Sequence, residues 1–203
     1  MYEIYLGIKR KWSISRISRE IEVSATTVLR EIRRNSNANG YNPLEINLKN
    51  VVSKNVTVKN CKFANFSNNA ISVFGMAEGG VLNIENNTFD LGKTSEAVRI
   101  SNKTNTKFTI NVKDCSYTYP TDAAGQGVGF FLFEDHTSKT AEEANAAMQF
   151  KNLKVNVDNV TFEGAKVTKL NLFSGARNQF ACMYYDKSGY VVDATHFPTF
   201  NFK

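Results

Sequence analysis

A phrase of eight residues recurs four times along this chain of 203 residues. In each copy, two apolar residues alternate with polar ones, Asn or Asp stands at the fifth position, and an aromatic residue closes the phrase. An alternation of period two predicts a strand with one buried face, and the Asn or Asp predicts a bend at its end. The chain is therefore predicted to contain four equivalent units. They are Val56–Phe63, Leu82–Phe89, Ile110–Tyr117 and Val155–Phe162.

The closing aromatic residues lie 26, 28 and then 45 residues apart. The first two intervals fall within the range of about 20 to 50 residues that is typical of stacked repeats. A second apolar alternation follows three of the phrases, at Ile71–Val73, Val98–Ile100 and Leu170–Leu172. In the third repeat this partner strand is delayed to Gly129–Phe133 by an insertion at Thr118–Val128. One unit cannot bury its own apolar face, so equivalent strands are expected to stack and share one core.

The simplest arrangement of these repeats is a right-handed parallel β-helix. Val58, Ile84, Val112 and Val157 would form one interior ladder, and the four closing aromatic residues would form a second. From about Leu44 to Gly175 the pattern resembles the pectate-lyase-like β-helix superfamily, with its Asn-bearing turns. An antiparallel β-sandwich gives a similar alternation and is the alternative fold.

The chain is predicted to consist of two modules, 1–43 and 44–203. The first holds eight basic and four acidic residues, so it contributes +4 of the formal net charge of +6. The second contains the repeats, at about 44–175, followed by 176–203, where a C-terminal β-hairpin and a final strand are expected. The predicted fold is mainly β, preceded by a small all-α segment, and the basic charge is concentrated at one end.

The basic segment has the spacing of a helix-turn-helix. Ser13 is expected to cap a helix at 14–21, and Ser24 a second helix with Val28, Leu29 and Ile32 facing inward. The residues from Trp12 to Asn35, with Gly40-Tyr41 after them, resemble the N-terminal DNA-binding unit of bacterial insertion-sequence transposases. This resemblance implies base contacts from some side chains of the second helix and phosphate contacts from others. The base contacts would be Ala25, Thr26, Thr27 and Arg30, and the phosphate contacts Arg33 and Arg34.

The chain departs from that transposase family after the helix-turn-helix. Such transposases continue into a nuclease domain whose carboxylates hold metal ions, whereas here Leu44 opens the β-repeat. Transposase activity is therefore not expected. Three cysteines without metal-ligand spacing are predicted to be free thiols, and neither a metal site nor a cofactor is predicted.

The β-helix resemblance also raises the question of catalysis, because such folds include polysaccharide lyases and hydrolases that act through surface carboxylates. The best candidates are Glu134, Asp135 and His136, with Glu96 and Arg99 one repeat away. Glu134, Asp135 and His136 are equally consistent with a solvated loop before Thr140–Met148. No catalytic residue is therefore predicted.

Two phenylalanine clusters have two interpretations. The run from Val128 to Phe133 is typical of a strand buried on both faces, or it marks a subunit contact. The phenylalanines of the C-terminal tail are also candidates for a subunit contact. The candidate interface residues are Phe130, Phe131, Phe133, Phe197, Phe200 and Phe202.

No apolar run approaches the ~18 residues of a membrane span, and no signal-peptide pattern is expected at the N-terminus. Short β-helices with added strands and free cysteines resemble structural components of tailed-phage virions. We therefore expect a non-catalytic virion structural protein, such as a capsid decoration or head-surface component. It would be a homo-oligomer that binds other virion proteins such as the capsid, assembled in the bacterial host cytoplasm and located in the virion. One alternative is a helix-turn-helix protein that binds double-stranded DNA through 1–43 and assembles through its β-module. Another is a carbohydrate-binding or depolymerising β-helix.

Overall fold

The computed structural model describes most of the chain, in two units. Contacts divide the chain into Met1–Ile46 and Asn47–Lys203, so the division falls three residues after the predicted seam. The described residues are 8, 10–34, 36–37, 40–41, 46–48, 51–64, 69–92, 96–101, 106–123, 129–135, 150–171, 180–185, 189–191 and 197–203.

The described residues of the first unit include the helices α2 (Ile14–Glu20) and α3 (Ala25–Arg34). The Ser13 Oγ accepts a hydrogen bond of 3.2 Å from the Arg16 N–H, which satisfies one of the free amides at the start of α2. Ile17 and Val28 are buried between the two helices, and Ile8, Trp12, Ile14 and Ile21 pack against them. Two short antiparallel strands follow, β1 (Ser36–Asn37) and β2 (Gly40–Tyr41).

The two predicted helices are therefore present, and of the three residues expected to face inward, Val28 is buried while the side chain of Ile32 lies outside the described part of the structure. Leu29 was expected to face inward beside Val28, but it is 41% exposed. Successive helical residues are rotated by about 100°, so Val28 and Leu29 do not lie on one buried stripe of α3.

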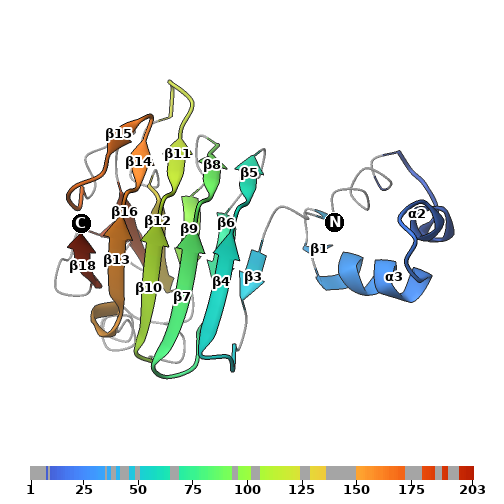
Figure 1. The fold of residues 1–203 in the computed structure, drawn as a ribbon, viewed down its shortest axis with the longest axis horizontal. Coiled ribbons are helices and arrows are strands. Elements are labelled where there is room, and N and C mark those ends of the chain that lie inside the picture. Colours follow the sequence, from blue (N-terminus) through green and yellow to red (C-terminus); the bar gives the residue numbers. More distant parts are fainter. Residues whose placement is uncertain are drawn as a thin grey trace. The chain divides into compact units, whose positions relative to one another are not determined.

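The second unit is built from strand triplets, one triplet per repeat (Figure 1). Each triplet contributes one strand to each of three sheets. The first sheet contains β4 (Asn55–Lys59), β7 (Gly80–Glu85), β10 (Phe108–Lys113), β13 (Lys154–Asp158) and β18 (Thr199–Phe202). The second contains β5 (Lys62–Ala64), β8 (Thr88–Asp90), β11 (Ser116–Thr118), β14 (Thr161–Phe162) and β15 (Ala165–Lys166). The third contains β3 (Ile46–Leu48), β6 (Asn69–Val73), β9 (Glu96–Ile100), β12 (Phe131–Asp135), β16 (Ala181–Tyr185) and β17 (Gly189–Val191). A 3₁₀-helix, Phe150–Asn152, precedes β13.

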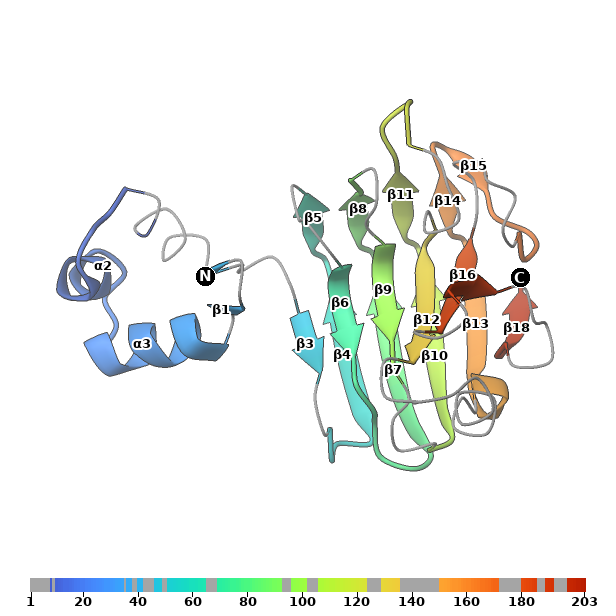
Figure 2. The same cartoon turned by 180° about the vertical axis from the view of Figure 1, so that it is seen from behind.

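Equivalent strands of successive repeats pair in parallel and in register, as seen from opposite sides in Figures 1 and 2. Val58 pairs with Ile84, Ile84 with Val112, and Val112 with Val157. The predicted interior ladders are confirmed, because the aromatic residues from Phe63 to Phe162 also pair in sequence. The alternative of an antiparallel sandwich is wrong for these strands, since the copies of the phrase run parallel.

The third sheet corrects one predicted strand. The expected partner strand of the fourth repeat, Leu170–Leu172, is not a strand at residues 170 and 171, and residue 172 lies outside the described residues. β16 takes that place beside β12, and it turns back into β17 as an antiparallel hairpin. The fully buried Phe180, immediately before β16, stacks on Phe130 with ring centroids 5.4 Å apart. This aromatic contact favours β16 over the less apolar segment at 170.

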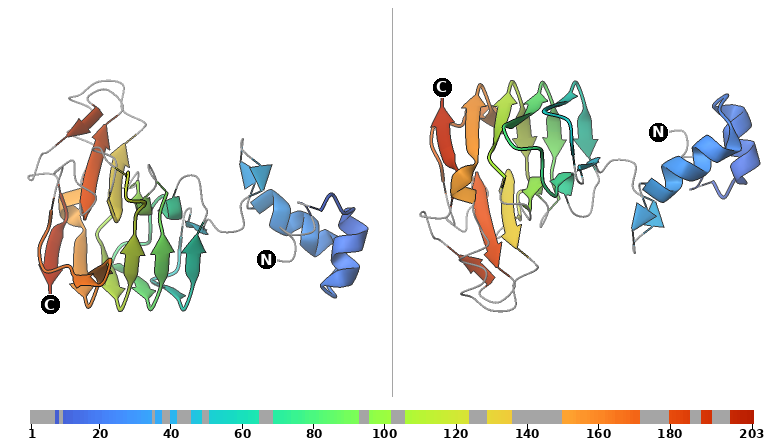
Figure 3. Two further views of the ribbon diagram at one scale, coloured as in Figure 1. Left: turned by 90° about the horizontal axis from the view of Figure 1, so that it is seen from above. Right: turned by 90° about the horizontal axis from the view of Figure 1, so that it is seen from below.

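The predicted bends also appear in each repeat. Asn60, Asn86, Asp114 and Asn159 have φ between 50° and 58°, in the left-handed region that Asn and Asp tolerate better than most residues. Their side chains join neighbouring bends, because Asn86 Nδ2 donates to Asn60 Oδ1 at 2.8 Å and Asn159 Nδ2 donates to Asp114 Oδ1 at 2.7 Å. Figure 3 shows the stacked strands of this unit from above and from below the view of Figure 1.

Candidate functional site

The predicted DNA-contacting residues lie on α3. Ala25, Thr26 and Thr27 form its first turn and are exposed. The Thr27 N–H donates to Ser24 Oγ at 3.1 Å, and the two hydroxyl oxygens lie 2.9 Å apart, so the Thr27 side chain is part of the cap. Arg30, Arg33 and Arg34 belong to the same helix, but their side chains lie outside the described part of the structure. Thr26 therefore presents an exposed hydroxyl group that is not part of the cap, and Ala25 beside it presents an exposed methyl group.

A second basic feature of the helical unit was not predicted. The guanidinium groups of Arg10 and Arg16 lie over the ring of Trp12, at 5.3 and 4.2 Å from its centroid. Trp12 lies just before the Ser13 cap and Arg16 lies in the first turn of α2, so the chain entering the helix brings the two side chains together. This cation–π cluster places two exposed positive charges beside one aromatic ring.

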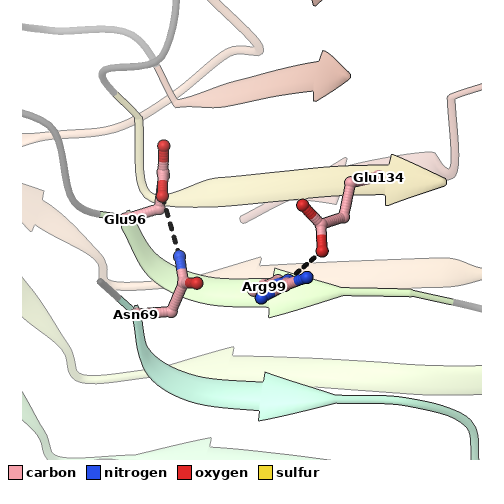
Figure 4. Close-up of polar contacts among 4 residues, drawn as sticks. All are labelled: Asn69, Glu96, Arg99 and Glu134. Atoms are coloured by element: carbon pink, nitrogen blue, oxygen red, sulfur yellow. Dashed lines mark hydrogen bonds and ion pairs between the residues drawn. The ribbon is translucent and has the colours of Figure 1, made fainter. Parts of the chain in front are cut away.

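The catalytic candidates meet on the third sheet (Figure 4). Asn69 on β6 lies opposite Glu96 on β9, and Asn69 Nδ2 donates to Glu96 Oε2 at 2.7 Å. Arg99, also on β9, forms an ion pair through Nε with Glu134 on β12. Glu96 and Arg99 are three residues apart on one strand, so their side chains leave on opposite faces of the sheet. The structure thus separates the candidates into two pairs.

The Asn69–Glu96 pair lies in the core, where Glu96 is 3% exposed. Burial raises the pKa of Glu96 from 4.5 to about 8, although the hydrogen bond from Asn69 and the positive charge of Arg99 act in the opposite direction. Glu96 is therefore protonated at neutral pH. Burial and the nearby Glu96 also raise the pKa values of Tyr119 and Cys182. The Tyr119 hydroxyl donates to the Gly129 carbonyl at 2.6 Å and accepts from its N–H at 2.8 Å.

The Arg99–Glu134 pair is also shielded from solvent. The Glu134 side chain is 4% exposed and that of Arg99 is 20% exposed. The Arg99 guanidinium lies 5.4 Å from the ring centroid of Phe74. The Asp135 side chain and His136 lie outside the described residues. Glycoside hydrolysis needs two carboxyl groups that reach substrate, about 5 to 10 Å apart, whereas Glu96 and Glu134 are both buried and engaged with partners.

The candidate interface phenylalanines divide into core and edge residues. Phe130, Phe131 and Phe133 are fully buried, and Phe197 is 5% exposed. Phe130 makes edge-to-face ring contacts with Phe89 and Tyr117, and Phe133 makes an edge-to-face contact with Phe150. These four rings are therefore core residues, and the interface interpretation does not hold for them, because contacts within one chain already cover them.

Only Phe200 and Phe202 are partly exposed among the six interface candidates. Their rings are stacked, with centroids 6.1 Å apart. They lie on β18, the last strand of the first sheet.

The cysteines offer no binding chemistry. Cys61, Cys115 and Cys182 are free thiols, and the last two are buried. Within the described ranges no group of three or more His, Cys, Asp or Glu side chains could hold a metal ion. None of the described helices is long and apolar enough to cross a membrane.

Comparisons of this chain with protein-family models, with curated proteins and with solved structures find no match.

Proposed function

We propose that this chain is a non-catalytic structural protein of a phage virion, built on a short right-handed parallel β-helix. The observation that carries the proposal is the unbroken register of the repeats. Equivalent strands pair residue for residue across the first sheet, from β4 through β7, β10 and β13 to β18. Such a stack has one continuous core and no internal hinge, which suits a stiff display or clamping element.

Polar ladders on the outer surface support the same role. Asn111 Nδ2 donates to Asn83 Oδ1 and Asn156 Nδ2 donates to Asn111 Oδ1, both at 2.8 Å. Asn201 continues the ladder to Asn156 at 2.9 Å. These contacts occupy polar side chains with neighbouring repeats, so that the surface of the stack is itself bonded from repeat to repeat.

The buried state of the carboxyl groups supports a non-catalytic role. Glu96 is neutral at pH 7 and is bonded to Asn69, while Glu134 is paired with Arg99. Both groups strengthen contacts between strands of neighbouring repeats. A depolymerising activity would need these groups to be open to a sugar chain.

The virion role is tested on particles. Phage particles from a host that carries this gene are banded by density-gradient centrifugation and digested for mass spectrometry. We expect peptides of this chain to accompany the major capsid protein at a constant ratio in every particle fraction. Detection only in particle-free fractions would contradict the proposal.

Binding of duplex DNA by the first unit is the second candidate function. The observation that favours it is the exposed first turn of α3, together with the exposed Arg10 and Arg16 of the same unit. Base edges would meet Thr26, and phosphates would meet the arginines.

The DNA test uses the full chain in a salt series, read through Trp12, the chain's single tryptophan. We expect affinity to fall steeply as salt rises, and Arg30→Ala to weaken binding at each salt concentration. Lys166→Ala is the charge-matched control, because Lys166 is exposed on β15 in the other unit. Equal losses in the two variants would show only nonspecific attraction and would rule out a helix-turn-helix contact.

A further inference from the structure

The strand β18 is an open edge. It pairs in parallel with β13, and among the described strands no other lies on its far side (Figure 1). The N–H groups of Thr199 and Lys203 donate to the carbonyls of Leu153 and Val157, at 3.1 and 3.0 Å. In a parallel ladder the N–H and C=O of alternate residues point to opposite sides. The backbone N–H and C=O groups of Phe200 and Phe202 therefore point away from β13, toward the open side.

The outer asparagine ladder also ends at this edge without a partner. Each Asn donates through Nδ2 to the Oδ1 of the preceding repeat, and Asn201 is the last member. Within the described part of the chain, Asn201 Oδ1 accepts no hydrogen bond. A further strand with a side-chain donor at the same position would extend the ladder.

The inner face of the edge is apolar and incompletely covered. Phe200 pairs with Val155 and Phe202 with Val157, and the two valines are fully buried. Phe200 and Phe202 themselves are only half-buried. A further strand with apolar residues beside both rings would cover them as β18 covers the valines.

A column of charged residues runs across the first sheet and reaches the β18 edge at Lys203. It indicates which charge a further strand would carry beside Lys203. Lys59 pairs with Glu85, Glu85 with Lys113, and Lys113 with Asp158. Lys203 follows Phe202, the partner of Val157, and so comes next to Asp158 in the same register. The signs alternate along the column, and the column ends on a positive charge. An acidic residue is the favourable next member, because opposite charges across strands stabilise a sheet and like charges destabilise it.

A second copy of this chain does not supply that strand. Its own free edge in this sheet is β4, where Val56, Thr57 and Val58 match the first three positions. The fourth position is Lys59, which would stand beside Lys203. The two other sheets end on antiparallel strands, β15 and β17, so end-to-end stacking of copies is also blocked there.

We propose that the β18 edge binds an extended segment of another protein, with the pattern apolar–Asn/Thr–apolar–Asp/Glu, as an added parallel strand. The main chain of the segment would bond to Phe200 and Phe202, its polar residue to Asn201, and its acidic residue to Lys203. This is β-augmentation, in which main-chain hydrogen bonds give affinity and alternate side chains give specificity. The docking edge follows from sheet geometry and charge alone, so it does not depend on the virion role.

The probe is a fluorescein-labelled peptide with the sequence of residues 154–160, which carries the pattern as Val155-Asn156-Val157-Asp158. Its binding to the full chain is measured by fluorescence anisotropy. A short Gly-Ser tag after Lys203 in every sample keeps the terminal carboxylate away from the edge. We expect the peptide to bind and its Asp158→Lys version to bind about fivefold more weakly. A peptide N-methylated at Asn156, whose N–H would face β18, is expected not to bind.

The matched protein variant is Lys203→Glu. Lys203 is exposed at the end of the strand, so placing a glutamate there beside Asp158 is expected to cost little stability. In this variant the preference is expected to reverse, with the Asp158→Lys peptide bound more tightly than the original. Binding of neither peptide, or equal binding of both by each protein, would overturn the proposal. A concentration-dependent dimer that excludes the peptide would overturn the choice of another protein as the partner.

Discussion

Asn69 and Glu96 face each other across two parallel strands of neighbouring repeats, joined by a hydrogen bond of 2.7 Å in the core. Both side chains are at most 3% exposed. Among the residues that the structure describes, Asn69 Oδ1 has no hydrogen-bond partner, so the pair is not fully satisfied there. A buried carboxyl beside an orphaned amide oxygen ties the stability of the stack to pH.

Stability is expected to fall as pH rises through the range set by Glu96. Its pKa is about 8 when folded and about 4.5 when unfolded, so between these values the folded state binds more protons. The free energy of unfolding therefore decreases from about pH 5 to pH 8, by several kcal/mol on the scale of about 1.4 kcal/mol per pKa unit. Glu96→Gln removes this slope and is expected to be more stable than wild type at pH 9. Urea denaturation at pH 5, 7 and 9 measures the free energy of unfolding of both proteins. The same pH dependence in the two proteins would contradict the assignment of the slope to Glu96.

Breaking the Arg99–Glu134 pair from one side is expected to destabilise the protein. Arg99→Met leaves the carboxylate of Glu134 buried without its cation, which costs about 3 kcal/mol. Adding Glu134→Gln to that variant removes the uncompensated charge and is expected to recover part of the loss. A double-mutant cycle by chemical denaturation gives the coupling, and strictly additive effects would show that the two groups do not interact.

The β14–β15 hairpin offers a stabilising substitution. Phe162 pairs with Ala165, so Glu163 and Gly164 form a two-residue turn, with φ of 48° and 85°. Positive φ at both positions favours Asn-Gly, and a glutamate in the left-handed region costs about 1 kcal/mol. Glu163→Asn is expected to raise the melting temperature by a few degrees. Glu163→Ala is the control, because it removes the same carboxylate without relieving the backbone, and it is expected to give no gain.

The three thiols are expected to react at very different rates. Cys61 is partly exposed, whereas Cys115 and Cys182 are buried. Burial raises the pKa of Cys115 to about 11, so little thiolate is present at pH 8. Labelling the native chain with a thiol reagent should modify Cys61 first, and mass spectrometry identifies the site. Rapid labelling of Cys115 in folded protein would contradict its burial.

The sequence predicts most of the repeat architecture, because strand periodicity and Asn bends are local signals. The alignment of Val58, Ile84 and Val112 follows from a phrase that repeats the same residues at the same positions. The place of β16 could not be predicted in this way, since it depends on the packing of Phe180 against Phe130, 50 residues away.

The polar contacts were less predictable. The pairing of Arg99 with Glu134 joins two repeats through an insertion, and the burial of both carboxyls depends on the three-dimensional path. The sequence does contain a signal for the outer asparagine ladder. Asn83, Asn111 and Asn156 occupy the same position of three phrases, and they form that ladder. Identical amides at equivalent positions of stacked strands indicate such a ladder.

The interval of 45 residues between the third and fourth phrases has a consequence for protein engineering. Loop-closure entropy grows only with the logarithm of length, so this interval costs about 0.5 kcal/mol more than one of 26 or 28 residues. The in-register pairing of β10 with β13 is kept across it. New sequence can therefore be inserted between these repeats at small thermodynamic cost, which makes this position suitable for carrying a foreign epitope or a tag.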